Sequence, residues 1–147
     1  MATYSRGQYK LKNPDKYIGI KTPIWRSSWE FAVMKMCDEN VNIEKWASES
    51  IRIPYRNPLT GKNTIYVPDF FVSFVDKNNM KHAELWEIKP ESHAVKEAVG
   101  KSKNNQAQFI INMAKWEAAR AFCRQQGIAF RIITEHDLFY STKKKKK

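Results

Sequence analysis

A carboxylate and an ammonium group lie two residues apart in an otherwise apolar stretch of the sequence. Glu87 and Lys89 occur within ELWEIKP, beside the apolar residues Leu85, Trp86 and Ile88. Successive side chains of a β-strand point to opposite faces, so residues two apart share a face. Because Leu85 lies on that same face, the pattern predicts charged groups at the margin of a buried surface. The alternative is an ordinary ion pair across the surface of two strands.

A third charged residue, Asp69, occurs in the apolar segment that precedes this one. Residues 63–76 and 80–90 are both rich in β-branched and aromatic residues, and a short polar stretch separates them. This pattern predicts a β-hairpin. With a three-residue loop, Asp69 lies directly opposite Glu87, whereas a five-residue loop places it opposite Lys89 on the same face.

This alignment depends on Pro68, which directly precedes Asp69. A proline has no amide hydrogen to donate to a neighbouring strand, so Pro68 predicts a bulge or a break in the pairing. A slip of one residue would turn the side chain of Asp69 to the other face of the sheet. The expected site therefore holds only if Asp69 keeps its phase relative to Glu87.

Two carboxylates and an ammonium group on one face have the composition of a site for metal-assisted phosphodiester hydrolysis. Directly opposed residues have Cβ atoms about 4.5–5.5 Å apart, and two carboxylates at that separation repel each other unless a cation lies between them. Mg²⁺ and Mn²⁺ prefer oxygen ligands. A bound metal activates water and stabilises charge on a phosphate, and Lys89 would orient the water or assist at the phosphate.

The rest of the chain predicts the elements that position this face. Apolar residues recur at helical spacing over residues 27–40 and 105–126, and strands are expected at residues 50–56 and 128–134. Residues 91–104 predict a loop or a short irregular helix. The expected fold class is a single α/β domain of order α-β-β-β-α-β, with a mixed central sheet flanked by helices.

Composition divides the chain into an arm, a domain and a tail. Residues 1–24 interleave five basic residues with three tyrosines and predict an extended arm, which would either bind nucleic acid or be anchored by its tyrosines. The domain is expected over residues 25–141, and residues 142–147 end in five lysines. The net charge is +11, or +6 without those five lysines, which favours a polyanionic partner.

Several classes of protein and site are not indicated. No apolar run is long enough for a membrane span, and we expect no signal peptide. The three histidines lack the spacing of a zinc site, and no glycine-rich phosphate loop is present. Cys37 and Cys123 fall within helical patterns, so packed thiols are expected rather than a disulfide.

These motifs resemble a known superfamily. YVPDF followed by ELWEIKP, in an α-β-β-β-α-β order, is similar to the PD-(D/E)xK nucleases. The segments RSSWE and MAKWEAARAFCRQQGIAFRIITE resemble the endonuclease subunit of certain cut-and-paste transposases. LKNPDKYIG and WASESIRIPYRNPLTGK extend the similarity to the head-completion nucleases of T-even-type bacteriophages, over nearly the whole chain apart from the lysine tail.

The resemblance implies a restriction-endonuclease-like fold and a deoxyribonuclease that depends on Mg²⁺ or Mn²⁺. Asp69 and Glu87 would be metal ligands, completed by the backbone carbonyl of Ile88, and Lys89 would position the nucleophilic water. Glu30 in the first helix is a further candidate ligand. It is also the fourth residue of a capping box, S-x-x-E, so a purely structural role stays open.

The resemblance also implies a substrate and a setting. Double-stranded DNA would be processed during head completion in the host cytoplasm, or by protein associated with the virion, with portal or neck proteins of the virion as candidate partners. Lys96, Lys101 and Lys103 follow the motif and are predicted phosphate contacts, with solvated surface lysines as the alternative. Two other functions stay open: a transposase-type, restriction or resolvase endonuclease, and a DNA-binding neck protein without catalytic activity.

Overall fold

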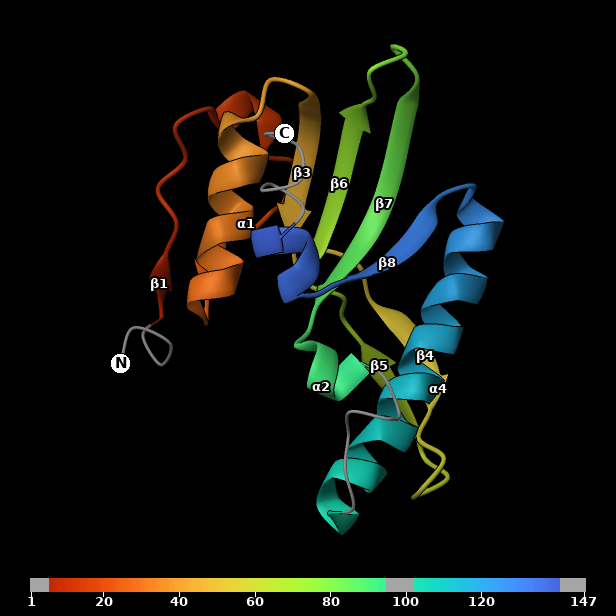
Figure 1. Cartoon of the computed structure of the whole chain (residues 1–147). Helices are drawn as coiled ribbons and strands as arrows, with labels where there is room; N and C mark the ends of the chain where they lie inside the picture. Colours follow the sequence, from red (N-terminus) through yellow and green to blue (C-terminus); the bar gives the residue numbers. More distant parts are fainter. Residues whose placement is uncertain (1–5, 95–101, 141–147) are drawn as a thin grey trace.

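The computed structural model describes residues 6–94 and 102–140, which include three α-helices, two single helical turns and a central sheet (Figure 1). In chain order the elements are β1 (Gly7–Gln8), η2 (Pro14–Lys16), β2 (Ile24–Trp25), α1 (Ser28–Glu39), β3 (Ile43–Ser48), β4 (Ile53–Arg56), β5 (Asn63–Tyr66), β6 (Phe70–Val75), β7 (Lys81–Ile88), α2 (Glu91–Ala94), α4 (Lys103–Gln126), β8 (Ala129–Ile133) and η3 (His136–Tyr140), of which η2 and η3 are single 3-10 and π turns. No helix within the described residues is long and apolar enough to cross a membrane.

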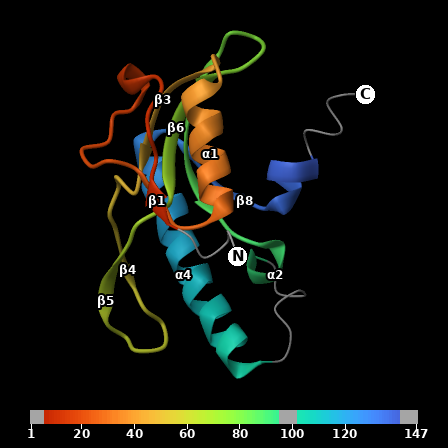
Figure 2. The ribbon, with the colours of Figure 1, turned by 90° about the vertical axis from the view of Figure 1, so that its left-hand side faces the viewer.

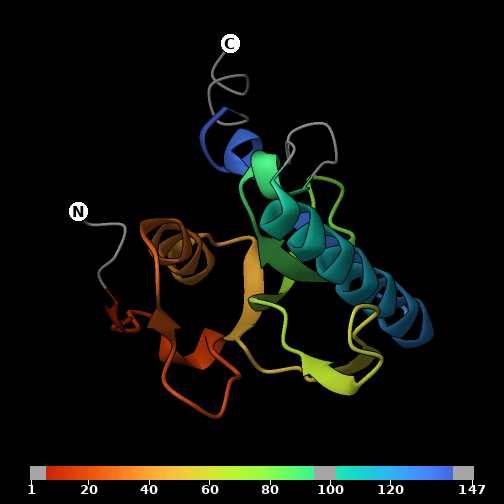
Figure 3. The same ribbon diagram turned by 90° about the horizontal axis from the view of Figure 1, so that it is seen from below.

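A mixed four-stranded sheet of order β3-β6-β7-β8 forms the centre of the molecule. β6 is antiparallel to both β3 and β7, whereas β7 and β8 are parallel. Helix α1 packs on one face of this sheet and helix α4 on the other, as the view from below shows (Figure 3). The fold class is therefore the expected one, an α/β core with a mixed sheet flanked by helices.

The first strand of the sheet is not the expected one. Residues 50–56 were predicted to supply it, but they form β4, which pairs with β5 in a separate two-stranded hairpin. The sheet instead begins with β3, where the register shifts between Ile43 and Lys45. Such an irregularity disrupts the alternation of buried and exposed side chains, so the pattern of a strand is lost from the sequence. The order α-β-β-β-α-β persists with the β4–β5 hairpin inserted after its first strand.

The segment 63–76 forms two strands rather than one. β5 ends at Tyr66 and β6 begins at Phe70, and the buried residue Pro68 lies in the break. The interruption predicted at Pro68 is therefore confirmed. It has a larger consequence than a bulge, because it transfers the chain from the peripheral hairpin to the central sheet.

Helix ends fall close to the residues that the sequence indicates. The Ser27 hydroxyl accepts a hydrogen bond from the Glu30 N–H at 3.2 Å and caps α1. Helix α4 starts at Lys103, after the N-cap Ser102. Gly127 closes α4 with φ of 72°, a left-handed conformation that a glycine adopts without steric cost.

Two apolar cores lie on the two faces of the sheet. The core under α1 contains, among others, Val33, Met34, Cys37, Trp46, Phe70, Val72 and Trp86. The core under α4 contains Ile53, Tyr66, Leu85, Trp116, Ala119 and Cys123. Each core holds one of the two cysteines, and both are buried free thiols. This agrees with the expectation of packed thiols.

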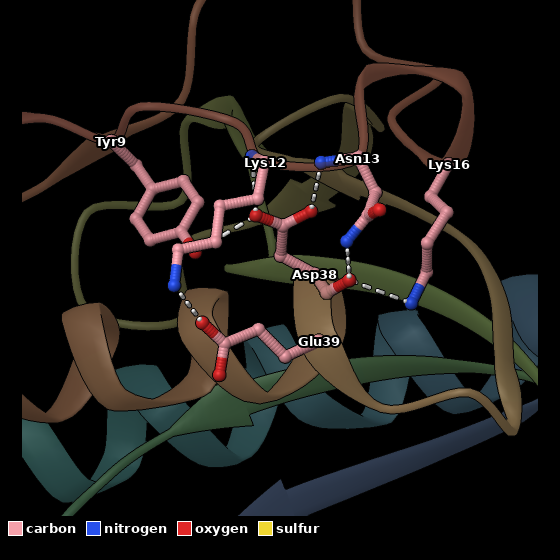
Figure 4. A network of polar contacts seen from close by, with 6 residues as sticks. All are labelled: Tyr9, Lys12, Asn13, Lys16, Asp38 and Glu39. Carbon is pink, nitrogen blue, oxygen red and sulfur yellow. Dashed lines mark hydrogen bonds and ion pairs between the residues drawn. The ribbon is translucent and has the colours of Figure 1, made fainter.

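The described part of the N-terminal arm is tied to the end of α1 by Asp38, which is completely buried (Figure 4). Asp38 Oδ2 accepts hydrogen bonds from the Tyr9 hydroxyl at 2.9 Å and from the Lys12 N–H at 2.8 Å, and Oδ1 accepts one from the Asn13 N–H at 3.0 Å. The Asn13 and Lys16 side chains donate to the Asp38 carbonyl. These contacts hold the described part of the arm against the end of α1, and Tyr9 is one of its anchors.

Candidate active site

The β6–β7 hairpin sets the phase of the predicted site. The ladder keeps a single register from the turn to Phe70, which pairs with Trp86. This is the alignment with a three-residue loop, because the Asp76 N–H donates to the Met80 carbonyl at 2.9 Å. Continued by one residue, the same register places Asp69 opposite Glu87.

Asp69 is fixed at this position although the ladder ends at Phe70. Its Oδ2 accepts a hydrogen bond from the Ile88 N–H at 2.8 Å, and its carbonyl accepts one from the Glu49 N–H at 2.9 Å. The first bond joins the side chain of Asp69 to the β7 backbone, directly after Glu87. The break at Pro68 therefore does not turn Asp69 away from the face that carries Glu87.

Glu87 is the most deeply buried charged residue of this cluster, with 8% of its surface exposed. Its Oε1 accepts a hydrogen bond from the Tyr66 hydroxyl at 2.7 Å, and its Oε2 lies 3.6 Å from Lys89 Nζ. The Lys89 side chain retains 28% exposure. Glu87 and Lys89 thus form an ion pair as the shared face suggested, but this pair lies at the edge of the core under α4 rather than on an open surface.

Tyr66 and Lys115 complete the surroundings of Glu87, and the sequence pattern did not single them out. Lys115, on α4, places its ammonium 5.7 Å from the centre of the Tyr66 ring. The only sequence signal for Tyr66 was its place in YVPDF, but its direction depends on the turn at Pro68. Lys115 precedes the buried Trp116, and its position depends on how α4 packs against the β4–β5 hairpin.

The two central carboxyl groups resist ionisation. Burial, followed by the negative charge of Glu87, raises the pKa of Asp69 well above its usual range, and the Ile88 N–H offsets this only in part. Burial also raises the pKa of Glu87, against the opposing effects of the Tyr66 hydroxyl and the Lys89 ammonium. The site therefore holds more negative charge than its own donors stabilise.

Glu30 lies near this pair but is engaged elsewhere. Its Oε1 accepts a hydrogen bond from the Arg26 N–H at 2.9 Å, one residue before the helix cap. Burial raises its pKa, and its charge in turn raises the pKa of Asp69. Within the described ranges, no three side chains of His, Cys, Asp or Glu lie close enough together to hold a metal ion. In this conformation Glu30 thus stands apart from the Asp69–Glu87 pair.

The donor set suits a hard divalent cation. Asp69 and Glu87 supply carboxylate oxygens, which Mg²⁺ and Mn²⁺ prefer over sulfur or imidazole. A cation between them would favour the ionised form of both groups, opposing the effects of burial and mutual repulsion. The raised pKa values are thus the observation that fits a metal at this position.

Of the three lysines predicted to bind phosphate, the structure describes one, Lys103. Lys96 and Lys101 lie outside the described residues, as does the lysine tail. Lys103 is the exposed first residue of α4. Their role as DNA contacts stays a prediction.

Two comparisons relate the chain to known proteins. A family model described as "TnsA-like endonuclease N terminal" matches residues 40–135, a range that contains Asp69, Glu87, Lys89 and every strand of the central sheet. The head completion nuclease of Enterobacteria phage T4 is 32% identical over 142 residues, which cover 90% of this chain and 92% of that protein.

Proposed function

The chain belongs to the family of TnsA-like endonuclease N-terminal domains, and from this premise we propose that it is a metal-dependent deoxyribonuclease that processes phage DNA during head completion. The family supports the nuclease activity, and the similarity to a head completion nuclease over nearly the whole chain supports the setting. The observation that carries the proposal is the cluster of Asp69, Glu87 and Lys89 on one face of the β6–β7 hairpin.

Asp69 and Glu87 would hold one or two Mg²⁺ or Mn²⁺ ions, with the carbonyl of Ile88 as a further oxygen ligand. When bound, the metal supplies Lewis acidity, which activates water and stabilises negative charge on the phosphate. Glu30 is an additional candidate ligand, and in that role its carboxylate would have to leave the N–H of Arg26.

The protein's own groups divide the remaining tasks. The Ile88 N–H occupies Oδ2 of Asp69, so Oδ1 is the oxygen available to a cation. The Tyr66 hydroxyl fixes Oε1 of Glu87 and directs Oε2 toward Lys89. The Lys89 ammonium would donate to the attacking water or to a phosphate oxygen, where its positive charge favours the transition state. A protein that only binds DNA does not require this combination.

The wider assignments belong to the same proposal. Residues 25–141 would form the nuclease domain, with residues 1–24 as its arm and 142–147 as a basic tail. The substrate would be double-stranded DNA, contacted through phosphates by Lys96, Lys101 and Lys103. Portal or neck proteins are the candidate partners, and the host cytoplasm during phage assembly is the expected location.

The test is a cleavage assay on linear and circular DNA with Mg²⁺, Mn²⁺ or EDTA. We expect cleavage with the metals and none with EDTA, and Asp69→Asn and Lys89→Ala each lower the rate at least about 100-fold, as the loss of an electrostatic contact in a transition state does. Glu44→Gln, which changes an exposed carboxylate on β3, is the matched control and retains activity. Cleavage by both site variants at the wild-type rate, or no wild-type cleavage with either metal, would contradict the proposal.

A further inference from the structure

A hollow separate from the catalytic carboxylates lies between the N-terminal arm and the connection from β3 to β4. Its volume is about 600 Å³. Its walls include the basic residues Lys21, Arg26 and Arg52 and the apolar residues Ile20, Ile24 and Val67. Figures 2 and 3 show the arm and the β4–β5 hairpin on the same side of the molecule, next to this connection. We call this hollow the arm pocket.

The arm pocket adjoins the catalytic cluster through the backbone. Glu49, which lines the pocket, donates its N–H to the carbonyl of Asp69 at 2.9 Å. Arg26, on the same wall, donates its N–H to Glu30. Val67 is two residues before Asp69 in the chain. The arm pocket is therefore joined to Asp69 through a backbone hydrogen bond and through the chain itself.

The backbone at this junction is strained. Glu49 has φ of 50°, a left-handed conformation that a residue other than glycine seldom adopts. Such residues persist where the surrounding contacts hold them, and they concentrate at functional sites. Here the contacts are the hydrogen bond to Asp69 and an ion pair between the Glu49 carboxylate and Arg26 at 3.1 Å. The junction between the pocket and the catalytic cluster is thus held in one defined geometry.

The walls of the arm pocket match the chemistry of a nucleotide. Three basic side chains and one carboxylate, that of Glu49, give the pocket a positive balance that suits a phosphate. The apolar residues provide a surface for a base. The volume also lies within the range of roughly 300–1,000 Å³ that is usual for ligand sites.

One apolar residue at the pocket is fully exposed. Ile20 has an exposed fraction of 102%, and Ile18, in the same loop of the arm, is 52% exposed. DNA-binding proteins combine basic residues with apolar side chains that contact bases where the stack is opened. An intact duplex keeps its bases stacked and presents phosphates to such a surface, so the apolar wall of the pocket would have no partner.

We propose that the arm pocket holds an unpaired nucleotide of the DNA strand next to the scissile phosphate. Lys21 and Arg52 contact the phosphate of this nucleotide, and Ile20, Ile24 and Val67 contact its base. This inference rests on the proposed nuclease function and narrows its substrate to DNA with an unpaired or easily unstacked nucleotide beside the cut, as at a gap, a flap or a junction.

The test measures DNA affinity by fluorescence anisotropy in the full-length Asp69→Asn protein, which binds without cutting. The two probes are an intact duplex of about 30 base pairs and the same duplex with a single-stranded gap of about three nucleotides. Arg52→Ala and Ile20→Ala are the pocket variants. Arg124→Ala, near the far end of α4, and Met80→Ala, in the β6–β7 turn, are controls that remove an exposed residue of comparable chemistry.

We expect each pocket variant to weaken binding of the gapped DNA about fivefold to tenfold, with less than about a twofold effect on the intact duplex, because the contact is made with a nucleotide that is unpaired only in the gapped DNA. The controls leave both affinities unchanged. An equal loss on both probes would mean that the pocket holds duplex phosphates, and no loss on either would mean that it does not contact DNA; both results overturn the inference.

The experiments distinguish a failure of the arm-pocket inference from a failure of the proposed nuclease function. If the wild-type protein cuts DNA but the pocket variants bind gapped and intact DNA like the controls, only the arm-pocket inference fails. If the wild-type protein cuts no DNA with either metal, the nuclease proposal fails, whereas anisotropy still reports whether the pocket selects an unpaired nucleotide. Thermal unfolding of Arg52→Ala and Ile20→Ala verifies that both variants stay folded.

Discussion

A carboxylate lies near each end of helix α1, and the protein shifts the pKa values of the two groups in opposite directions. At the C-terminal end, burial alone would raise the pKa of Asp38, but hydrogen bonds from the Lys12 N–H, the Tyr9 hydroxyl and the Asn13 N–H outweigh it and lower the pKa (Figure 4). Near the N-terminal end, burial and the charge of Glu87 raise the pKa of Asp69, whose carboxylate accepts one hydrogen bond from the described part of the chain, that of the Ile88 N–H.

The difference separates a structural carboxylate from a functional one. The charge of Asp38 is compensated within the chain, at a helix end where the dipole disfavours an anion, so its donors are needed for stability. Hydrogen-bond donors and basic groups of the protein stabilise the charges of Asp69 and Glu87 only in part. A shortage of donors at a buried pair of carboxylates is typical of a site that binds a cation. Burial alone does not distinguish the two, whereas the donors do.

The largest expected difference between the two carboxylates is in their contribution to the stability of the fold. We expect Asp38→Asn to lower the free energy of unfolding by about 2–4 kcal/mol, because the amide nitrogen would face a donor and leave it unpaired. Asp69→Asn should leave the metal-free protein as stable as the wild type or more stable, since it removes a repelling charge. Urea denaturation in EDTA measures both. Equal destabilisation by the two variants would show that both carboxylates are structural.

The pH dependence of stability sharpens the same contrast. The pKa of Asp38 is lowered in the folded state, so its stabilisation is present above the usual carboxyl pKa and is lost as the pH falls through the folded value. The pKa of Asp69 is raised, so the folded state loses stability as the pH rises from the usual value through the raised one.

Thermal unfolding across the acid range, in EDTA, tests these signs. We expect Asp38→Asn to differ most from the wild type toward neutral pH, as a loss of stability, and to converge with it in acid. Asp69→Asn should become more stable relative to the wild type as the pH rises. Added Mg²⁺ should restore the wild type but not Asp69→Asn. If both variants lost stability toward neutral pH, Asp69 would be a structural carboxylate like Asp38.

The smallest expected effect concerns a single donor at the functional pair. Tyr66→Phe keeps the ring in the core but removes the hydroxyl that donates to Glu87. Because this hydrogen bond lowers the pKa of Glu87, its loss should move the acid limb of the cleavage rate to higher pH and cost about 1 kcal/mol of stability. Tyr55→Phe, a half-buried tyrosine of the same hairpin, is the control. Identical pH profiles for the two variants would contradict a role of Tyr66 at the site.

The parts of the site that were predictable are those set by short-range rules. The three-residue loop fixed the register of the hairpin, so Asp69 could be placed opposite Glu87 from the sequence. The alternation of side chains put Lys89 beside Glu87. The cap at Ser27 and the left-handed Gly127 likewise depend on a few adjacent residues.

Elements governed by distant contacts were not predictable. The irregular register of β3 hides its strand pattern, and the β4–β5 hairpin looks like part of the sheet until its pairing is known. The burial of Asp38 depends on donors from the arm, more than twenty residues away along the chain. Tyr66 donates to Glu87, and Lys115 acts electrostatically on Glu87, only because the chain breaks at Pro68 and α4 packs against the β4–β5 hairpin.

The sequence by itself thus determined which residues carry the chemistry and how those of one hairpin are phased, since side-chain alternation and turn length act locally. Only the tertiary structure decided which carboxylates are compensated, because the pKa of a buried group depends on every donor and charge packed against it. It also decided where the arm lies, and so created the pocket beside Asp69. Local periodicity contains no information about either, since both arise from contacts between segments far apart in the chain.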